Sequence, residues 1–281
     1  MMQAYPRPTA WLVHALVMAL GILMLYPILW LISSSFKPDH LIFSDLRLWP
    51  AEITLDNYVK GWNGISGTSF GSFLANSMLL CLLAVLGNLV SCSMAAYAFG
   101  RLDFSLKNIW FGLMMVTIML PHHVTIIPQY VLFHKLGWVD TFSPLTVPKL
   151  LATDAFFIFL MVQFIRGLPR DLDESGRIDG CGPIQIYWRI VMPLALPALI
   201  TTAIFTFIWT WDDFFSQLLY LNTPAKYTVP LGLRMFLDSS SQSNWGAMMA
   251  MSVVSLIPSL VIFFSLQRYF VEGISTSGIK G

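Results

Sequence analysis

Six runs of predominantly apolar residues dominate this sequence, and each is close to the roughly 20 residues that a helix needs to cross a bilayer. They cover residues 11–34, 73–99, 109–131, 145–165, 198–219 and 247–269. Only 11% of the residues are charged, whereas soluble chains carry about 25%. Because lipid leaves no partner for a free backbone amide, helices are the expected structure of such runs. We therefore predict an all-α polytopic membrane protein with six transmembrane helices, folded as a single domain over residues 1–281.

Prolines interrupt several of these runs. Pro27, Pro121, Pro128, Pro148 and Pro258 lie in or at the ends of predicted spans. Neighbouring helices can satisfy the carbonyl groups that a proline frees, so the prolines can mark kinked helices around a cavity. They can equally mark the ends of helices. The sequence leaves both interpretations open.

Residues 166–197 form the most polar connection between two spans. Pro169 suits the first position of a helix, where its missing N–H is no loss, and the acidic side chains that follow favour the positive end of the helix dipole. We expect this helix to stop at Gly180, a second short helix to open at Pro183, and Pro193 to end it. The prediction is a helix-turn-helix outside the membrane.

The second helix of this loop is amphipathic. Ile184, Tyr187, Trp188 and Val191 follow helical spacing and form one apolar stripe. Such a stripe needs something to lie against, and we expect it to serve as a docking face.

Charge sets the predicted orientation. An even number of spans places both termini on one side, and basic residues in short loops favour the cytoplasm. With both termini cytoplasmic, the inner segments hold the larger share of basic residues, namely Arg7, Arg101, Lys107, Arg166, Arg170, Arg177, Arg189, Arg268 and Lys280. Two long loops, residues 35–72 and 221–245, then lie outside, and we expect short helices in the first of them.

Two adjacent acids occur near the outer part of the fifth span. Asp212 and Asp213 are costly in lipid, so at least one should face the bundle interior or a wet cavity. Neighbouring residues on a helix point about 100° apart, so both cannot face the same way. Trp209 and Trp211 can stack on the face of a sugar, or can belong to an interfacial aromatic belt. His122 and Gln129 are weaker candidates for a solute path.

The sequence argues against several kinds of chemistry. Adjacent His122 and His123 lack the spacing of a zinc protease motif, and Cys81, Cys92 and Cys181 match neither a disulfide framework nor a metal site. We find no Gly-rich phosphate loop and no hydrolase nucleophile signature, so no catalytic residue, metal or cofactor is predicted in this chain. Its basic residues form no cluster of the kind that binds nucleic acid.

The polar loop carries a recognisable motif. Glu174-Ser175-Gly176, Asp179-Gly180-Cys181, Ile190, Pro193 and Pro197 resemble the EAA loop of bacterial ABC importer permeases. That family has Glu-Ala-Ala, Asp-Gly-Ala and then Ile-x-x-Pro, so Ser175, Gly176 and Cys181 depart from its pattern but remain small. Small residues permit close helix docking, although Gly176 weakens its helix relative to alanine.

Further stretches resemble the carbohydrate uptake subfamily, represented by the second permease subunit of the maltose transporter. They are Ser34-Ser35-Phe36-Lys37, Asn76-Ser77, Ala95-Ala96-Tyr97-Ala98, Asn244-Trp245-Gly246 with Met249-Ala250, and the tail formed by Gln267 to Val271 and Gly278 to Gly281. That subfamily usually has Trp-Asn-Asp/Glu-Phe where this chain has Trp211-Asp212-Asp213-Phe214. The additional acid makes an anionic solute less favourable.

The resemblance implies a permease subunit that moves a sugar or related solute across the bacterial inner membrane by alternating access. It implies four kinds of contact: a second homologous permease, two ATPase subunits that hold ATP and Mg, an extracytoplasmic solute-binding protein, and the lipid bilayer. The coupling loop would contact the ATPase through Glu174, Ser175, Gly176, Asp179, Gly180, Ile184, Tyr187, Trp188, Ile190 and Pro193.

The sequence is also compatible with two other classes of membrane protein. An ion-coupled secondary transporter would use Asp212 or Asp213 as an ion site and would need no ATPase. An intramembrane enzyme would use His122, His123 and Asp213. Within the importer class, a polyol or a sugar phosphate is an alternative solute.

Overall fold

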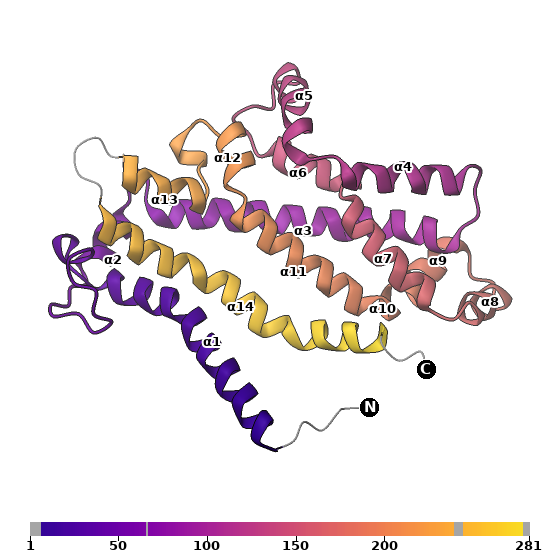
Figure 1. Ribbon diagram of the computed structural model, residues 1–281. Coiled ribbons are helices and arrows are strands. Elements are labelled where there is room, and N and C mark those ends of the chain that lie inside the picture. Colours follow the sequence, from indigo (N-terminus) through magenta and orange to yellow (C-terminus); the bar gives the residue numbers. More distant parts are fainter. Residues whose placement is uncertain (1–6, 66, 239–243, 278–281) are drawn as a thin grey trace. The chain divides into compact units, whose positions relative to one another are not determined.

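The computed structural model describes residues 7–65, 67–238 and 244–277, which form helices joined by short loops (Figure 1). Some helical side chains, including those of His122 and His123, lie outside the described set. Within the described part, β-pairing is limited to one bridge between Ile65 and Thr68. The elements in chain order are α1 (Arg7–Ser35), η1 (Asp39–Leu41), α2 (Asp56–Asn63), α3 (Phe70–Arg101), α4 (Lys107–Met119), α5 (His122–Lys135), α6 (Ser143–Leu150), α7 (Ala155–Gly167), α8 (Asp171–Ile178), α9 (Pro183–Ile186), η2 (Tyr187–Val191), α10 (Met192–Leu194), α11 (Leu196–Asp212), α12 (Phe214–Tyr220), η3 (Pro224–Lys226), α13 (Val229–Asp238) and α14 (Trp245–Ser277).

The all-α membrane fold is confirmed. Among the described residues, four stretches are long and apolar enough to cross a membrane, and two bent helix pairs raise the number to six. The first, second and sixth predicted spans correspond to α1, α3 and α14. The short helices expected in the loop after α1 are present as η1 and α2. The N-terminal 1–6 and the tail from 278 onward lie outside the described residues.

The third predicted span, over 109–131, is divided at a proline, which is one of the two outcomes that the sequence left open. It consists of α4 and α5, which meet at a sharp bend. The residue before a proline avoids the helical region, and Leu120 accordingly has φ −75° and ψ 123°. Pro121 then stands at the N-cap of α5, also extended. Here the proline ends a helix, whereas Pro27, Pro148 and Pro258 lie inside helices.

The fourth and fifth spans are also interrupted. A turn between α6 and α7 includes Ala152 at φ +54° and ends at Asp154. The fifth span, predicted over 198–219, is divided at Asp213 into α11 and α12. Asp213 caps α12 by accepting a hydrogen bond from the Ser216 N–H at 3.0 Å. These two interruptions therefore each have a carboxylate beside them.

Contacts gather in two compact units, one formed by 1–71 with 232–257 and the other by 72–231 with 258–281. The prediction of a single domain stays a prediction. In the first unit, Asn57 on α2 donates hydrogen bonds to the carbonyls of Ser35 and Lys37, at 2.9 and 2.8 Å. Lys37 is fully buried and donates to two loop carbonyls. Gly246 on α14 contacts Asn57 so closely that a side chain there would collide with it.

In the second unit, α3 is the long element about which the others gather (Figure 1). Its 32 residues give it a length of about 48 Å. Near its first residues, the Asn76 amide donates to the carbonyls of Ala225 and Tyr227. Toward its last residues, α3 packs against α7 and the α9–α10 segment in a core that includes Cys92, Tyr97 and Met161.

A carboxylate fastens the loop after α5 to the loop after α12. Asp140, at φ +61°, accepts hydrogen bonds from the backbone N–H groups of Asn222 and Thr223, both at 2.9 Å. Its other oxygen accepts from the Thr223 hydroxyl at 2.6 Å and pairs with Lys226 at 2.8 Å. These donors, Lys226 first, hold the pKa of Asp140 well below its usual range.

We predict that Asp140→Ala lowers the thermal unfolding midpoint of the detergent-solubilised protein by about 2–4 °C, the shift that corresponds to roughly 1 kcal/mol in a protein of this size. The pKa of Asp140 is lower in the folded protein than in the unfolded chain, where it is about 3.9. The stabilisation from the Asp140 carboxylate is therefore fully present above that pH and is lost as the pH falls below it. Asp140→Asn is the control, since it tolerates the positive φ and keeps an acceptor but should remove the pH dependence. Equal midpoints for wild type and Asp140→Ala at pH 7 would contradict this assignment.

Candidate functional site

The helix-turn-helix predicted from 166–197 is present as α8 followed by α9, η2 and α10, beside the C-terminal part of α3 (Figure 1). Helix α8 begins after Pro169 and carries three acids in its first turn. It ends at Ile178, and Gly180 takes φ +80°, a conformation that favours glycine. The predicted stop at Gly180 is therefore confirmed. The structure places Glu174, Ser175 and Asp179 on the exposed side of this segment.

The second helix opens at Pro183 as predicted, with Gln185 accepting a hydrogen bond from the Gly182 N–H at 2.9 Å. Pro193 was expected to end it, but the proline lies inside α10. The reason is the π-turn η2 that precedes it, in which the Met192 N–H bonds to the Tyr187 carbonyl. A π-turn widens the helix, which relieves the contact between a proline ring and the preceding turn. The chain then bends by 76° into α11.

The apolar stripe of this helix divides into two parts, which corrects the prediction of one four-residue docking face. Tyr187 and Val191 are only 5% and 1% exposed and belong to the core of the second unit. The Tyr187 hydroxyl lies 2.7 Å from that of Ser93, and the Tyr97 hydroxyl donates to the Pro183 carbonyl at 3.0 Å. This half of the stripe attaches the loop to the chain's own bundle.

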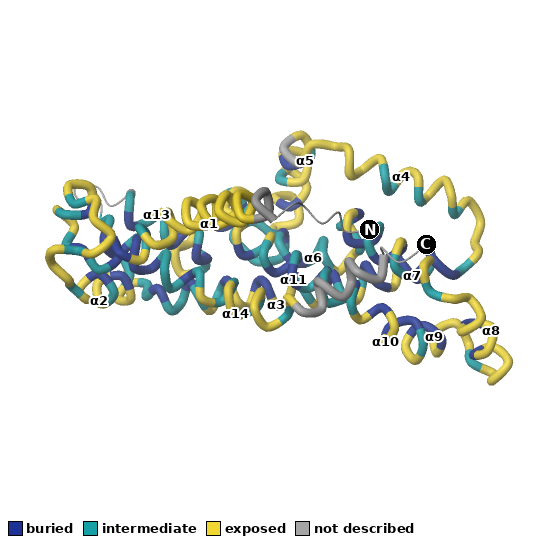
Figure 2. Tube along the Cα trace, turned by 60° about the horizontal axis from the view of Figure 1, so that its bottom comes forward, coloured by how far each residue is buried: buried dark blue, intermediate teal, exposed yellow. Residues whose placement is uncertain are grey.

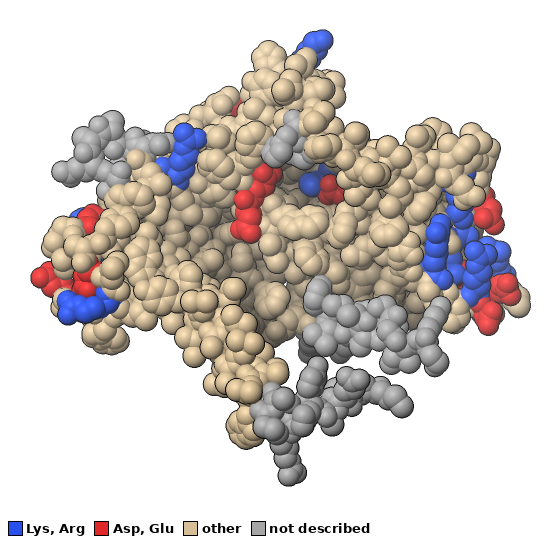
Figure 3. All heavy atoms as spheres, in the orientation of Figure 1, with Lys and Arg blue, Asp and Glu red and all other residues tan. Residues whose placement is uncertain are grey.

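The other half of the stripe remains on the surface. Ile184 is 74% and Trp188 58% exposed, and Ile178 at the end of α8 is 86% exposed. Figure 2 shows this exposure along α8 and α9, and Figure 3 shows Lys, Arg, Asp and Glu gathered over the same part of the second unit. Three large apolar side chains are thus exposed on this segment, and exposed apolar surface bordered by polar residues is typical of protein interaction sites.

Gly176 allows α8 to lie close to the helix that follows. A Cβ placed there would meet the Cδ1 atom of Ile190 at 2.7 Å and the Cγ1 atom of Ile186 at 3.5 Å. The glycine that departs from the motif therefore weakens its helix but lets α8 pack tightly against η2. Cys181 closes the turn by donating its N–H to the Gly176 carbonyl at 2.8 Å.

An ion pair joins α8 to the end of α3. The Nε atom of Arg101 lies 3.2 Å from a carboxylate oxygen of Asp173, and both residues are only 8% exposed. Arg101 also donates to the Leu168 carbonyl at 2.9 Å. The sequence does not predict this pair, because the two residues are far apart in the chain and no spacing pattern links them.

A second candidate site is a cavity of about 150 Å³ beside the break between α11 and α12. Asp213 and Trp209 line it, together with Leu80, Leu145, Lys149, Phe157, Thr206, Thr210 and Gln217. Gln217 is buried, donates to the Thr210 carbonyl at 2.8 Å and bonds to the Thr228 hydroxyl. Carboxylate, amide, hydroxyl and aromatic groups thus meet in one cavity, with the Lys149 ammonium group in its lining.

The predicted path residues do not all meet at this cavity. Trp211 is 4% exposed and stacks on Phe207, so its ring is used within the protein. Trp209 is half exposed, and its ring packs at tilted angles against Phe156, Phe157 and Phe205. Asp212 and Gln129 are exposed elsewhere. The side chain of His122 lies outside the described residues.

One wall of the cavity belongs to a polar network that sequence analysis also missed. Lys149 pairs with Asp154 at 2.7 Å across the turn between α6 and α7. Asn88 on α3 donates to Asp154 at 2.6 Å and to the Thr206 hydroxyl at 3.1 Å. Three helices are therefore tied together by groups that would be expensive to leave unpaired in a membrane.

Comparisons with known proteins agree with this arrangement. Residues 87–276 match the family described as the binding-protein-dependent transport system inner membrane component. The permease AraQ of the arabinooligosaccharide transport system of Halalkalibacterium halodurans is 31% identical over 277 residues, which cover 97% of each chain. The permease SugB of the trehalose transport system of Mycobacterium tuberculosis is 33% identical over 278 residues, or 98% of each chain.

A solved structure shows the same fold. It is that of a bacterial ABC transporter involved in the import of the acidic polysaccharide alginate, with a TM-score of 0.84 and 21% identity over 96% of this chain and 99% of the other. The resemblance predicted from the EAA-like loop and the scattered landmarks is confirmed by these matches. The chain belongs to the binding-protein-dependent transport system inner membrane component family and is a multi-pass inner-membrane permease of an ABC importer.

Proposed function

We propose that this chain moves a neutral sugar or oligosaccharide through the membrane, driven by ATP hydrolysis on separate subunits that contact α8 and α9. The observation that carries the proposal is the divided stripe. Tyr187 and Val191 lie in the core of the second unit, whereas Ile184 and Trp188 are exposed. A partner that pulls on the exposed half therefore moves α3 and α7 with it, which is the rigid-body coupling that alternating access requires.

The cavity beside Asp213 is the proposed contact with the solute. An indole face provides apolar area for a sugar ring, and carboxylate and amide oxygens accept hydrogen bonds from its hydroxyls. The arabinooligosaccharide and trehalose permeases among the relatives support a carbohydrate. Asp213 disfavours an anionic solute, since Lys149 is already paired with Asp154. A polyol remains the alternative that this chemistry allows.

The proposed complex contains a second homologous permease, two ATPase subunits that hold ATP and Mg, and an external solute-binding protein. Helix α1 supports a further membrane partner, because the apolar side chains of 11–28 are exposed along its length. In this proposal both termini and α8–α10 lie in the cytoplasm. The loops around η1, α2 and α13 then lie on the opposite side, where the binding protein would approach.

We predict that Trp188→Glu, alone or with Ile184→Arg, weakens ATPase binding at least about 30-fold, because a buried tryptophan at an interface commonly contributes 2 kcal/mol or more. The measurement is co-purification of the ATPase with the permease, followed by titration of the two. Trp49→Glu is the matched control, since Trp49 is 82% exposed in the first unit, far along the chain from α9. Full retention of the ATPase by Trp188→Glu would refute the docking face.

Asp213→Asn should lower solute affinity or uptake rate by about tenfold or more, the effect of losing a hydrogen bond to a charged group. The asparagine can still accept the Ser216 N–H, so α12 should remain capped. Asp212→Asn is the control, because Asp212 does not line the cavity. The readout is uptake of the solute held by the cognate binding protein, with ATPase assembly measured in parallel. Equal effects of the two substitutions would remove Asp213 from the path.

A further inference from the structure

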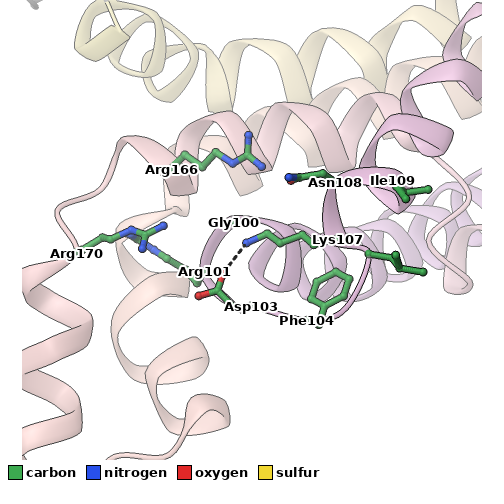
Figure 4. Close-up of a pocket in the computed structure, with 10 residues that line it drawn as sticks. Gly100, Arg101, Asp103, Phe104, Lys107, Asn108, Ile109, Arg166 and Arg170 are labelled. Atoms are coloured by element: carbon green, nitrogen blue, oxygen red, sulfur yellow. Dashed lines mark hydrogen bonds and ion pairs between the residues drawn. The ribbon is translucent and has the colours of Figure 1, made fainter.

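An open groove of about 750 Å³ lies where α3 ends, α4 begins and α7 passes into α8. Four basic side chains line it, those of Arg101, Lys107, Arg166 and Arg170, with Asp103 as the acidic one. Figure 4 shows these side chains around a common space, with Lys107 directed at Asp103. The groove therefore has a strong excess of positive charge.

Two of the four cations are already neutralised. Arg101 pairs with Asp173 at 3.2 Å, and Lys107 lies 3.5 Å from Asp103. Among the described residues, neither Arg166 nor Arg170 forms an ion pair. Arg166 contacts the Phe99 carbonyl at 3.3 Å, and its guanidinium lies 5.0 Å from the centre of the Phe111 ring. Two guanidinium charges thus remain available to an anion.

The N-terminus of α4 adds backbone donors to the same groove. Leu106 stands at the N-cap with φ +61° and has no side-chain group that can cap the helix. The N–H groups of Asn108 and Ile109, both in the lining, belong to the first turn, where an α-helix provides no partners. Guanidinium groups and free helical N–H groups together suit a phosphate.

An apolar stripe leads from the groove along α4. Leu106, Ile109, Leu113 and Val116 lie on one helix face, and each is more than half exposed. From Leu106 to Val116 the helix rises by about 15 Å. This is roughly half of the 30 Å thickness of the hydrocarbon core. Figure 2 shows α4 exposed over most of its length. The stripe therefore matches the depth of one leaflet, beginning at the basic groove.

We propose that this groove binds the phosphate headgroup of an anionic phospholipid of the cytoplasmic leaflet, with an acyl chain along α4. The leaflet follows from the proposed orientation of the chain. Arg166 and Arg170 hold the phosphate, the α4 N-terminus contacts its oxygens, and the stripe from Leu106 to Val116 accommodates the chain. A free phosphate shares the headgroup chemistry but leaves the stripe unused.

The test is native mass spectrometry of the intact complex in detergent, titrated with dioleoyl phosphatidylglycerol and, separately, with dioleoyl phosphatidylcholine. We expect preferential retention of phosphatidylglycerol, weakened roughly 30-fold by Arg166→Gln/Arg170→Gln, given about a fivefold effect for each basic residue near a membrane surface. Arg177→Gln/Arg189→Gln is the matched control, because it removes the same charge from exposed positions outside the groove. It should leave retention unchanged.

Three results would overturn the proposal. They are equal retention of the two lipids, unchanged retention in the Arg166/Arg170 variant, and displacement of phosphatidylglycerol by millimolar inorganic phosphate. Loss of the ATPase from that variant with lipid retention intact would instead assign the groove to the ATPase. The lipid readout needs no transport, so its failure is distinguishable from failure of the proposed permease cycle.

Discussion

Several polar side chains of α3 are paired within the second unit, and the packing of that unit depends on those pairs. A polar side chain inside a membrane must find its partners within the protein. Asn76 binds loop carbonyls, Asn88 binds Asp154, Ser93 binds Tyr187 and Arg101 binds Asp173. One helix of about 48 Å is therefore attached to the loop after α12, to the turn between α6 and α7, and to the segment from α8 to η2.

The same contacts hold the segment of residues 166–197 against the bundle. Tyr187 and Val191 share the core with α3 and α7, and Asp173 is held by Arg101. A buried pair of this kind contributes little net stability, yet removal of one partner is costly because the other charge is left unpaired. Its value here lies in fixing the position of α8. Ile184 and Trp188 remain exposed on the same segment.

Much of the fold could be predicted because its signals are local. Long apolar runs give α1, α3 and α14, and Pro169, Gly180 and Pro183 give the boundaries of the coupling helices. Other features depend on contacts between distant residues. The π-turn that accommodates Pro193, the burial of Tyr187 and Val191, and the stacking of Trp211 on Phe207 follow from tertiary packing. Helical spacing shows that residues share one face of a helix. It does not show which of those residues the rest of the protein buries.

The same limit applies to the candidate sites. The sequence does not distinguish Asp212 from its neighbour Asp213. In the structure the helix breaks at Asp213, and Asp213 lines the cavity whereas Asp212 does not. The Lys149–Asp154 pair was hidden in a span predicted as one continuous helix, because the turn between α6 and α7 has no proline at its centre. The landmarks Ser35 to Lys37 and Gly246 have a structural basis as well, since both meet Asn57.

We propose that α8 must be fixed to α3 for ATP hydrolysis to drive transport. It is tested most directly by the number of solute molecules taken up per ATP hydrolysed in proteoliposomes that contain the whole complex with Asp173→Ala in this chain. Asp171→Ala, an exposed change on the same helix, provides the reference. We expect Asp173→Ala to keep the ATPase bound and hydrolysing but to lower this ratio severalfold. A ratio equal to that of wild type in a fully assembled complex would contradict it.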